Sequence, residues 1–417
     1  MWQKIFKAQT LRQAIVTSVA TFLASGFGAV FYLLLAKILG PAEYGLYSLA
    51  MAAMAVTVSV ADLGLAQSLV RFIGANRQDK KYMPFVNLAL KTKLISGTLV
   101  IIAFLGVSSL LANYVFRQPA LSSLLPFVGL AVLTQLLFFL SLAIFQGLQK
   151  FILWGSFQVG TNAFRLLILI PVVTFFHLTA LQSLIIFVMA YIAGFGMSLF
   201  YIDKEILKTS STNVQTKLFW DFNKWTAVTG ILMAVASRVD ILLAARFLSL
   251  TQVGVYSLAT IMAAFLPQLA GAIGAVTTAK FASFSDAESP KRYLGKAIWF
   301  VGGVSTIVAL AMVPVAGIVI LFAGRTDYVT AFLPFLILLL GFVLFSFTNP
   351  VRDSLMYYYA KPQFFFWLNL GQALTVLLVG WNLIPLWGVL GAALSFVAGQ
   401  FFASSASIWY YKKITNI

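Results

Sequence analysis

The sequence contains no cysteine, a single histidine and few charged residues. Without cysteine the chain has no disulfide framework, thiolate nucleophile or cysteine-ligated iron–sulfur cluster, and His177 alone leaves little for a histidine-rich metal site. Charged residues make up 9% of the 417 residues, against about a quarter in an ordinary soluble domain. These shortages exclude a soluble globular protein and predict neither a metal nor another cofactor.

Motifs for nucleotide binding and hydrolysis are also missing. The sequence holds no GxxxxGK[ST] phosphate loop, no HExxH and no GxSxG. The loops between apolar runs are too short to fold as a catalytic domain. We therefore expect a protein that is not an enzyme and that takes its energy from a source other than ATP hydrolysis by this chain.

Apolar residues make up 61% of the chain and form runs longer than the roughly 18 residues that a membrane-spanning helix needs. The pattern predicts an all-α polytopic membrane protein. Dividing the sequence at charged residues, Gly and Pro gives about twelve spans: 12–38, 42–70, 83–113, 120–147, 151–176, 178–202, 218–248, 252–282, 292–323, 329–349, 363–381 and 385–411.

The formal charge of +17 arises from Lys and Arg in short segments between the spans. A nucleic-acid-binding protein gathers such residues on one soluble face, so we expect no nucleic acid partner. Alternating spans place most basic residues on one side of the membrane, which predicts that both termini are cytoplasmic. Four fall on the other side: Lys37, Arg117, Arg246 and Arg325.

A sequence repeat divides the chain in two. LAKILGPAEYGLYSLAMA (Leu35 to Ala52) aligns without a gap with AARFLSLTQVGVYSLATI (Ala244 to Ile261), so that Gly45 matches Gly254 and Tyr47 matches Tyr256. This predicts a six-helix lobe over 1–202, a cytoplasmic linker over 203–217 and a second six-helix lobe over 218–417. Lobes with an even number of spans share one orientation, which implies a pseudo-two-fold axis along the membrane normal and a central cleft.

Two arginines lie deep within predicted spans. Arg165 follows Lys150 by 15 residues and Arg238 follows Lys224 by 14, which places both about 20 Å into the membrane from the same side. A charge at that depth is costly and indicates function or a specific partner. We expect either a structural ion pair or carbonyl contact for each arginine, or a cationic site that binds an anionic substrate in one cavity.

Polar residues accompany Arg165 on its helix. Gln158 and Asn162 share its face at helical spacing, and this stripe would not tolerate lipid. Asn369 and Gln372 form a weaker stripe on the eleventh span, for which close helix packing is the alternative explanation.

Two carboxylates, Asp240 and Asp62, also lie within predicted spans. Asp240 and Arg238 point about 200° apart on a helix, so Asp240 needs another partner, either a cation on a neighbouring helix or a coupling proton or sodium ion. Asp62 lies near a helix end, where capping or an ion pair with Arg71 or another loop cation is the simpler interpretation.

Four segments carry a resemblance to a known family: LLLAKILGPAEYGLYSLAMA (Leu33 to Ala52), DLGLAQSLVRF (Asp62 to Phe72), FQGLQKF (Phe145 to Phe151) and RVDILLAARFLSLTQVGVYSLA (Arg238 to Ala259). They resemble the polysaccharide-biosynthesis flippases, the lipid-linked oligosaccharide exporters of the multidrug/oligosaccharidyl-lipid/polysaccharide exporter superfamily. The resemblance implies a fold like that of the multidrug (MATE) exporters and a location in the inner (plasma) membrane.

The implied function is movement of an undecaprenyl-diphosphate-linked oligosaccharide from the cytoplasmic to the outer leaflet. Expected partners are this lipid-linked oligosaccharide, membrane lipid, a coupling H⁺ or Na⁺ and other membrane proteins of polysaccharide assembly. Two alternatives stay open: a cation-coupled drug or small-molecule antiporter of the same superfamily, and a non-transporting scaffold. A membrane-embedded glycan polymerase or ligase would need a sizeable outer loop with catalytic groups, and none of the predicted outer loops provides one.

Overall fold

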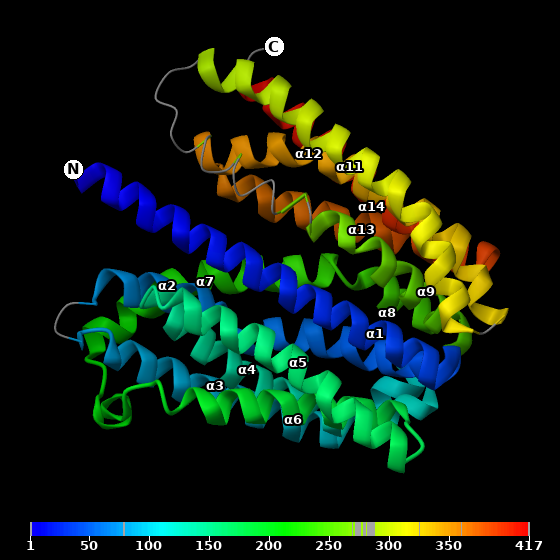
Figure 1. The fold of residues 1–417 in the computed structure, drawn as a ribbon, viewed down its shortest axis with the longest axis horizontal. Coiled ribbons are helices and arrows are strands. Elements are labelled where there is room, and N and C mark those ends of the chain that lie inside the picture. Colours follow the sequence, from blue (N-terminus) through cyan, green and yellow to red (C-terminus); the bar gives the residue numbers. More distant parts are fainter. Residues whose placement is uncertain are drawn as a thin grey trace. The chain divides into compact units, whose positions relative to one another are not determined.

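The computed structural model describes residues 2–77, 80–268, 270–271, 277, 281, 288–324, 326–359 and 361–415. This part of the chain consists of helices joined by short turns and contains no β-strand (Figure 1). Arg325 and part of the predicted span 252–282 lie outside the described residues.

The helices match the predicted spans in order. Ten helices in the described part are long and apolar enough to cross a membrane, or eleven if α7 and α8 form one span. Their bounds are α1 Trp2–Asp62, α2 Leu65–Ala75, α3 Met83–Leu110, α4 Leu125–Gly147, α5 Phe151–Phe175, α6 Ala180–Ser198, α7 Asn213–Ala236, α8 Val239–Phe247, α9 Leu250–Ala263, α11 Glu288–Ala323, α12 Phe332–Asp353, α13 Pro362–Trp387 and α14 Val389–Thr415.

Two backbone breaks explain how α1 and α2 differ from the predicted spans. Gly40 has φ 74° and ψ 172°, which no helix accommodates, and it precedes Pro41. The helix α1 therefore contains the first predicted span and most of the second. The second span was predicted to run to residue 70, which is wrong, because Leu63 and Gly64 both adopt positive φ and end α1 at Asp62.

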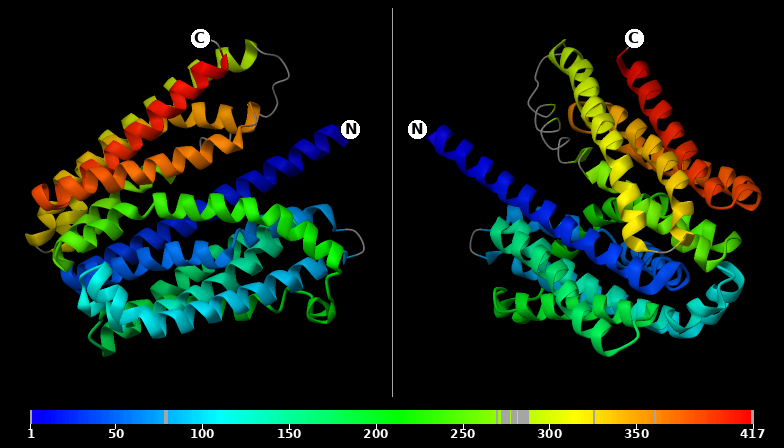
Figure 2. Two further views of the ribbon diagram at one scale, coloured as in Figure 1. Left: turned by 180° about the vertical axis from the view of Figure 1, so that it is seen from behind. Right: turned by 45° about the vertical axis from the view of Figure 1, so that its right-hand side comes forward.

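The chain forms two compact units. Unit 1 contains Met1–Ile38 and Ala50–Ala234, and unit 2 contains Leu39–Leu49 and Val235–Ile417. In unit 1, α4 packs against α3 and α6, and α5 packs against α6. In unit 2, α14 packs against α12 and α13, and α11 packs against α12, with these helices side by side in each view (Figures 1 and 2). Contacts thus place most of α7 with unit 1 and a short stretch of α1 with unit 2.

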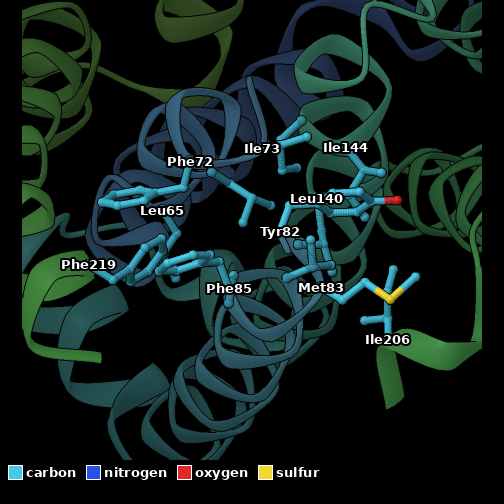
Figure 3. Close-up of a cluster of buried hydrophobic side chains, with 14 residues drawn as sticks. Leu65, Phe72, Ile73, Tyr82, Met83, Phe85, Leu140, Ile144, Ile206 and Phe219 are labelled. Carbon is cyan, nitrogen blue, oxygen red and sulfur yellow. The ribbon is translucent and has the colours of Figure 1, made fainter. Parts of the chain in front are cut away.

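One end of unit 1 is held by an aromatic and aliphatic core (Figure 3). The Phe72 ring of α2 stacks on Phe85 of α3 at 4.8 Å and meets Phe219 of α7 at 5.3 Å between centroids. Ile206, in the short 3₁₀ helix Lys204–Lys208, is buried in the same core. Asn87 Nδ2 donates to the Ile206 carbonyl oxygen at 2.7 Å. These contacts fix the first half of the predicted linker against unit 1.

The exposed start of that linker carries an ion pair. Lys80 Nζ donates to Asp203 Oδ2 at 2.6 Å, and this hydrogen bond lowers the pKa of the Asp203 carboxyl. A lowered folded-state pKa means that the contribution to stability is present above the ordinary carboxyl pKa and is lost as the pH falls through the lowered value. Because the pair is exposed, its effect on stability is small.

The repeat contacts its own copy in unit 2. A Cβ added to Gly45 would overlap the Leu250 carbonyl oxygen, and a Cβ added to Gly254 would overlap the Pro41 carbonyl oxygen. The repeat offset pairs Gly45 with Gly254 and Pro41 with Leu250, so the two contacts are equivalent. Residues 39–49 of α1 and α9 therefore cross at backbone contact, through two contacts at equivalent positions of the repeat.

We expect Gly45→Ala and Gly254→Ala each to lower stability by about 3 kcal/mol, the upper end of overpacking costs, because the obstacle is a backbone carbonyl that cannot rotate away. Gly26→Ala in α1 is the matched control, since a Cβ there meets nothing within 4 Å. Thermal unfolding of the detergent-purified variants measures the difference. Equal melting temperatures for Gly45→Ala and Gly26→Ala would show that the helices do not cross this closely.

Candidate functional site

The polar stripe of α5 forms a connected set of side chains. Arg165 Nη1 donates to Asn162 Oδ1 at 3.2 Å, and Asn162 Nδ2 donates to the Gln158 backbone carbonyl at 2.9 Å. Arg165 is only 4% exposed, whereas Gln158 and Asn162 are half-buried. The structure therefore joins the side chains of Asn162 and Arg165, whereas the contact to Gln158 is made through its backbone carbonyl.

Aromatic side chains of α6 contact the Arg165 guanidinium. The Arg165 Cζ atom lies 4.0 Å from the Phe187 ring centroid and 4.8 Å from that of Tyr191. Gln135 of α4 donates to the Tyr191 hydroxyl at 3.4 Å. A desolvated cation–π contact of this kind contributes about 2 kcal/mol. Sequence patterns identified the arginine but not these rings, because the rings lie on another helix.

The helix α1 packs closely against the polar stripe of α5 through small residues. A Cβ on Gly28 would lie 3.4 Å from Asn162 Oδ1, and a Cβ on Gly155 would meet the Ala20 methyl group at 2.5 Å. Backbones approach this closely only where side chains are small. The α1–α5 contact thus places the backbone of α1 next to the Asn162 side chain.

Asp62 makes a buried ion pair that the sequence interpretation missed. It pairs with Lys93 of α3, which is fully buried, and its Oδ2 accepts from the Ala66 backbone N–H at 3.2 Å. The Arg71 guanidinium instead lies 4.1 Å from the Phe222 ring centroid. The sequence analysis counted Lys93 with the basic residues of the cytoplasmic side, because it is not one of the four on the other side. Its position ten residues inside the predicted span 83–113 could have indicated that it is buried in the membrane.

The helix α7 packs against the break between α1 and α2, next to Asp62, and is hydrogen-bonded to it. Asn223 Nδ2 donates to the Leu63 carbonyl oxygen, and Ser68 Oγ donates to Asn223 Oδ1 at 2.7 Å. A Cβ on Gly64 would lie 2.6 Å from the Ala227 backbone nitrogen. The left-handed turn, the ion pair and α7 therefore form one packed region of unit 1.

Asp240 lies in the first turn of α8 and is 5% exposed. Its Oδ2 accepts from the Tyr256 hydroxyl of α9 at 2.6 Å. In the first copy of the repeat the corresponding residues are Phe31 and Tyr47, so the tyrosine is repeated but the carboxylate is not. The Asp240–Tyr256 pair is therefore particular to unit 2.

We expect Tyr256→Phe to destabilise the protein by about 1–3 kcal/mol, because it leaves the buried Asp240 carboxylate without this donor. The double variant Asp240→Leu/Tyr256→Phe should recover most of that loss, because both polar partners are then removed. Thermal unfolding at fixed pH measures both effects. A Tyr256→Phe protein as stable as the wild type would contradict the assigned hydrogen bond.

The remaining predicted site residues, Arg238, Asn369 and Gln372, belong to unit 2. Arg238 is exposed at the break between α7 and α8, where it is the N-cap residue of α8. Asn369 and Gln372 are half-buried on α13. A Cβ on Gly399 of α14 would lie 3.5 Å from Gln372 Cγ, so Gln372 contributes to a helix–helix contact.

Comparison with known proteins decides the family. The sequence profile described as polysaccharide biosynthesis protein matches residues 10–285, about two thirds of the chain. The chain belongs to this family. A sequence search of the curated proteins finds no match.

Solved structures share the fold of this family member over nearly its whole length. It is similar to the lipid II flippase MurJ in an inward closed conformation (TM-score 0.77, 15% identity, 95% of this chain and 87% of the other). It is also similar to an inward-facing multidrug resistance MATE family transporter of the MOP superfamily (TM-score 0.74, 14% identity, 97% and 98%). A MOP superfamily transporter from Pyrococcus furiosus follows (TM-score 0.68, 14% identity, 97% and 95%).

These likenesses confirm the predicted fold class. The family member is an all-α, multi-pass membrane protein with the MATE-like fold of MOP superfamily transporters. At about 15% identity the likeness establishes the fold but not the substrate.

Proposed function

We propose that the protein is a flippase that moves a polyprenyl-diphosphate-linked oligosaccharide from the cytoplasmic to the outer leaflet by alternating access. Membership of the polysaccharide biosynthesis family and the fold shared with transporters support this proposal. Family and fold together favour a transporter over a glycan polymerase or ligase.

The observation that carries the proposal is the buried guanidinium of Arg165. It lies near the middle of α5 and contacts the neutral groups of Asn162, Phe187 and Tyr191. Arginine binds phosphate oxygens through a planar pair of donors, and its charge attracts a diphosphate that has left water. A lipid-linked substrate has one anionic group that must cross the membrane, and a cation at this depth lowers the cost of that step.

The other predicted residues receive roles from the same chemistry. Arg238 is proposed as a second contact for the anion. The amides of Gln158, Asn162, Asn369 and Gln372 are proposed to line the path of the hydrated glycan. Asp240 is proposed as a coupling residue for H⁺ or Na⁺, because its carboxylate is buried and hydrogen-bonded to a neutral tyrosine. Asp62 is better assigned to structure, because Lys93 already compensates its charge.

A cation-coupled drug antiporter is the second candidate, since a multidrug transporter shares the fold. A first-lobe carboxylate free to bind a cation would favour it. In unit 1 the Asp62 carboxylate is paired with Lys93, and Arg165 is a second buried cation. The electrostatics of unit 1 therefore favour an anionic cargo.

Cargo selection in proteoliposomes tests the two candidates. Vesicles containing the purified protein are supplied either with a radiolabelled polyprenyl-diphosphate oligosaccharide or with a fluorescent organic cation, each with and without an imposed proton or sodium gradient. We expect translocation of the lipid-linked glycan and no gradient-driven exchange of the cation. Exchange of the cation without glycan movement would replace the flippase by the antiporter.

A further inference from the structure

A groove between α5 and α6 lies outside the contacts described above. It has a volume of about 200 Å³ and lies near the turn that joins the two helices. Ile168 and Val172 of α5 and Ile185, Ile186 and Met189 of α6 contribute to its almost wholly apolar lining. An apolar cavity of about 150 Å³ accommodates a benzene molecule, so this groove has room for a short branched hydrocarbon segment.

The groove and the Arg165 guanidinium share one helix–helix interface. Ile168 and Val172 follow Arg165 by three and seven residues and therefore lie on the same face of α5. On α6, Ile186 directly precedes Phe187, whose ring centroid is 4.0 Å from the guanidinium carbon. The first residue of the groove on α5, Ile168, thus lies about one helical turn along the helix from Arg165, and the groove continues from there toward the α5–α6 turn.

The depth of the cation decides which lipid fits. Arg165 follows the first residue of α5 by 14 positions, about 21 Å, which is well inside a hydrocarbon core about 30 Å thick. A phospholipid keeps its phosphate at the membrane surface, so its acyl chain would bring an apolar end to the cation. A lipid whose anionic group reaches mid-membrane would instead place that group at Arg165 and its first apolar units in the groove.

Resting on the proposed function, we propose that the α5–α6 groove binds the first isoprenoid units of the polyprenyl chain while the diphosphate is bound at Arg165. The anion then gains a charge-assisted contact, and the adjoining hydrocarbon gains a complementary apolar surface on the same two helices. The rest of the chain stays in the lipid, because the groove is too small to hold it.

Photocrosslinking tests this assignment. The probe is a polyprenyl-diphosphate oligosaccharide with a diazirine on the isoprenoid unit next to the diphosphate, reconstituted with the protein in phospholipid vesicles. Ile185→Trp and Met189→Trp each fill the groove. Ile170→Trp is the matched control, because Ile170 is 65% exposed on α5 and does not line the groove. Size-exclusion chromatography and thermal unfolding confirm that each variant is folded.

We expect wild-type labelling within residues 168–172 and 185–189, at least five-fold weaker labelling in both groove variants and unchanged labelling in Ile170→Trp. Labelling at other helices, or undiminished labelling in both groove variants, would overturn the inference. So would equal groove labelling by a diazirine phospholipid that excess substrate does not displace, because the groove would then hold structural lipid.

Translocation measured in the same vesicles separates this inference from the proposed function. If the wild type translocates the glycan lipid but the groove is not labelled, only the groove assignment fails. If the wild type neither translocates nor binds the glycan lipid, the proposed function fails and the groove assignment fails with it.

Discussion

Arg165→Ala is expected to weaken binding of a polyprenyl-diphosphate oligosaccharide by about 10- to 100-fold while the protein remains folded. Hydrogen bonds to charged groups contribute about 1.5–3 kcal/mol, which corresponds to this range. Arg165→Lys should have an intermediate effect, because lysine keeps the charge but loses the planar pair of donors and the stacked contact with Phe187 and Tyr191. Binding to the purified protein, measured by scintillation proximity with radiolabelled substrate, gives both values.

Arg117→Ala is the matched control for the Arg165 variants. It removes the same charge from an exposed connecting residue between α3 and α4, so binding should stay close to that of the wild type. Equal losses in Arg117→Ala and Arg165→Ala would indicate a general effect of net charge. Wild-type affinity in a folded Arg165→Ala protein would exclude Arg165 from the substrate site.

Breaking the Asp62–Lys93 pair is expected to cause the largest loss of stability. Lys93→Met leaves a carboxylate without its cation, and Asp62→Asn leaves a fully buried ammonium without its anion. Removing one partner of a buried ion pair costs about 3–5 kcal/mol. Thermal unfolding in detergent should therefore show a strongly lowered melting temperature for each single variant.

The double variant Asp62→Asn/Lys93→Met separates the pair's charge from its packing. It should recover most of the lost stability, because no unpaired charge stays buried. The exposed pair formed by Lys224 and Asp221 is the control, and Lys224→Met should change stability by less than about 1 kcal/mol. A double variant no more stable than the single variants would show that the two side chains do not act as a pair.

The double variant also tests whether Asp62 couples transport to an ion. If the pair has only a structural role, the folded double variant keeps its response to a proton or sodium gradient. Loss of that response in a stable double variant would assign coupling to Asp62 instead. Asp240→Asn is the corresponding variant in unit 2, and we expect it to lose the gradient response.

Local sequence patterns predicted most of the helices and the polar stripe. A membrane span and a break in a helix are both determined by residues that are close in the sequence. Hydropathy and the positions of Gly and Pro therefore located the spans and the interruption at Gly40. Helical periodicity alone placed Asn162 and Arg165 on one face of α5, where their side chains are hydrogen-bonded. The repeat offset correctly paired Gly45 with Gly254, although it gave no indication that their backbones touch.

Contacts between distant segments could not be predicted in this way. Asp62 pairs with a residue 31 positions away, and Asn223 bonds to a residue 160 positions away, so neither partner appears in any local pattern. The same limit applies to Phe187 and Tyr191 beside Arg165. It also applies to α7, which the repeat assigns to the second lobe but which packs mainly with unit 1.

We propose above all that a cationic site in the membrane carries an anionic lipid-linked glycan between leaflets. Leaflet-resolved translocation of a fluorescent polyprenyl-diphosphate oligosaccharide in proteoliposomes tests it most directly, with the wild type compared with Arg165→Ala and the Arg165→Ala/Arg238→Ala double variant. We predict rapid translocation by the wild type, a strong reduction in Arg165→Ala and none above empty vesicles in the double variant. Wild-type translocation by a folded double variant would contradict the account.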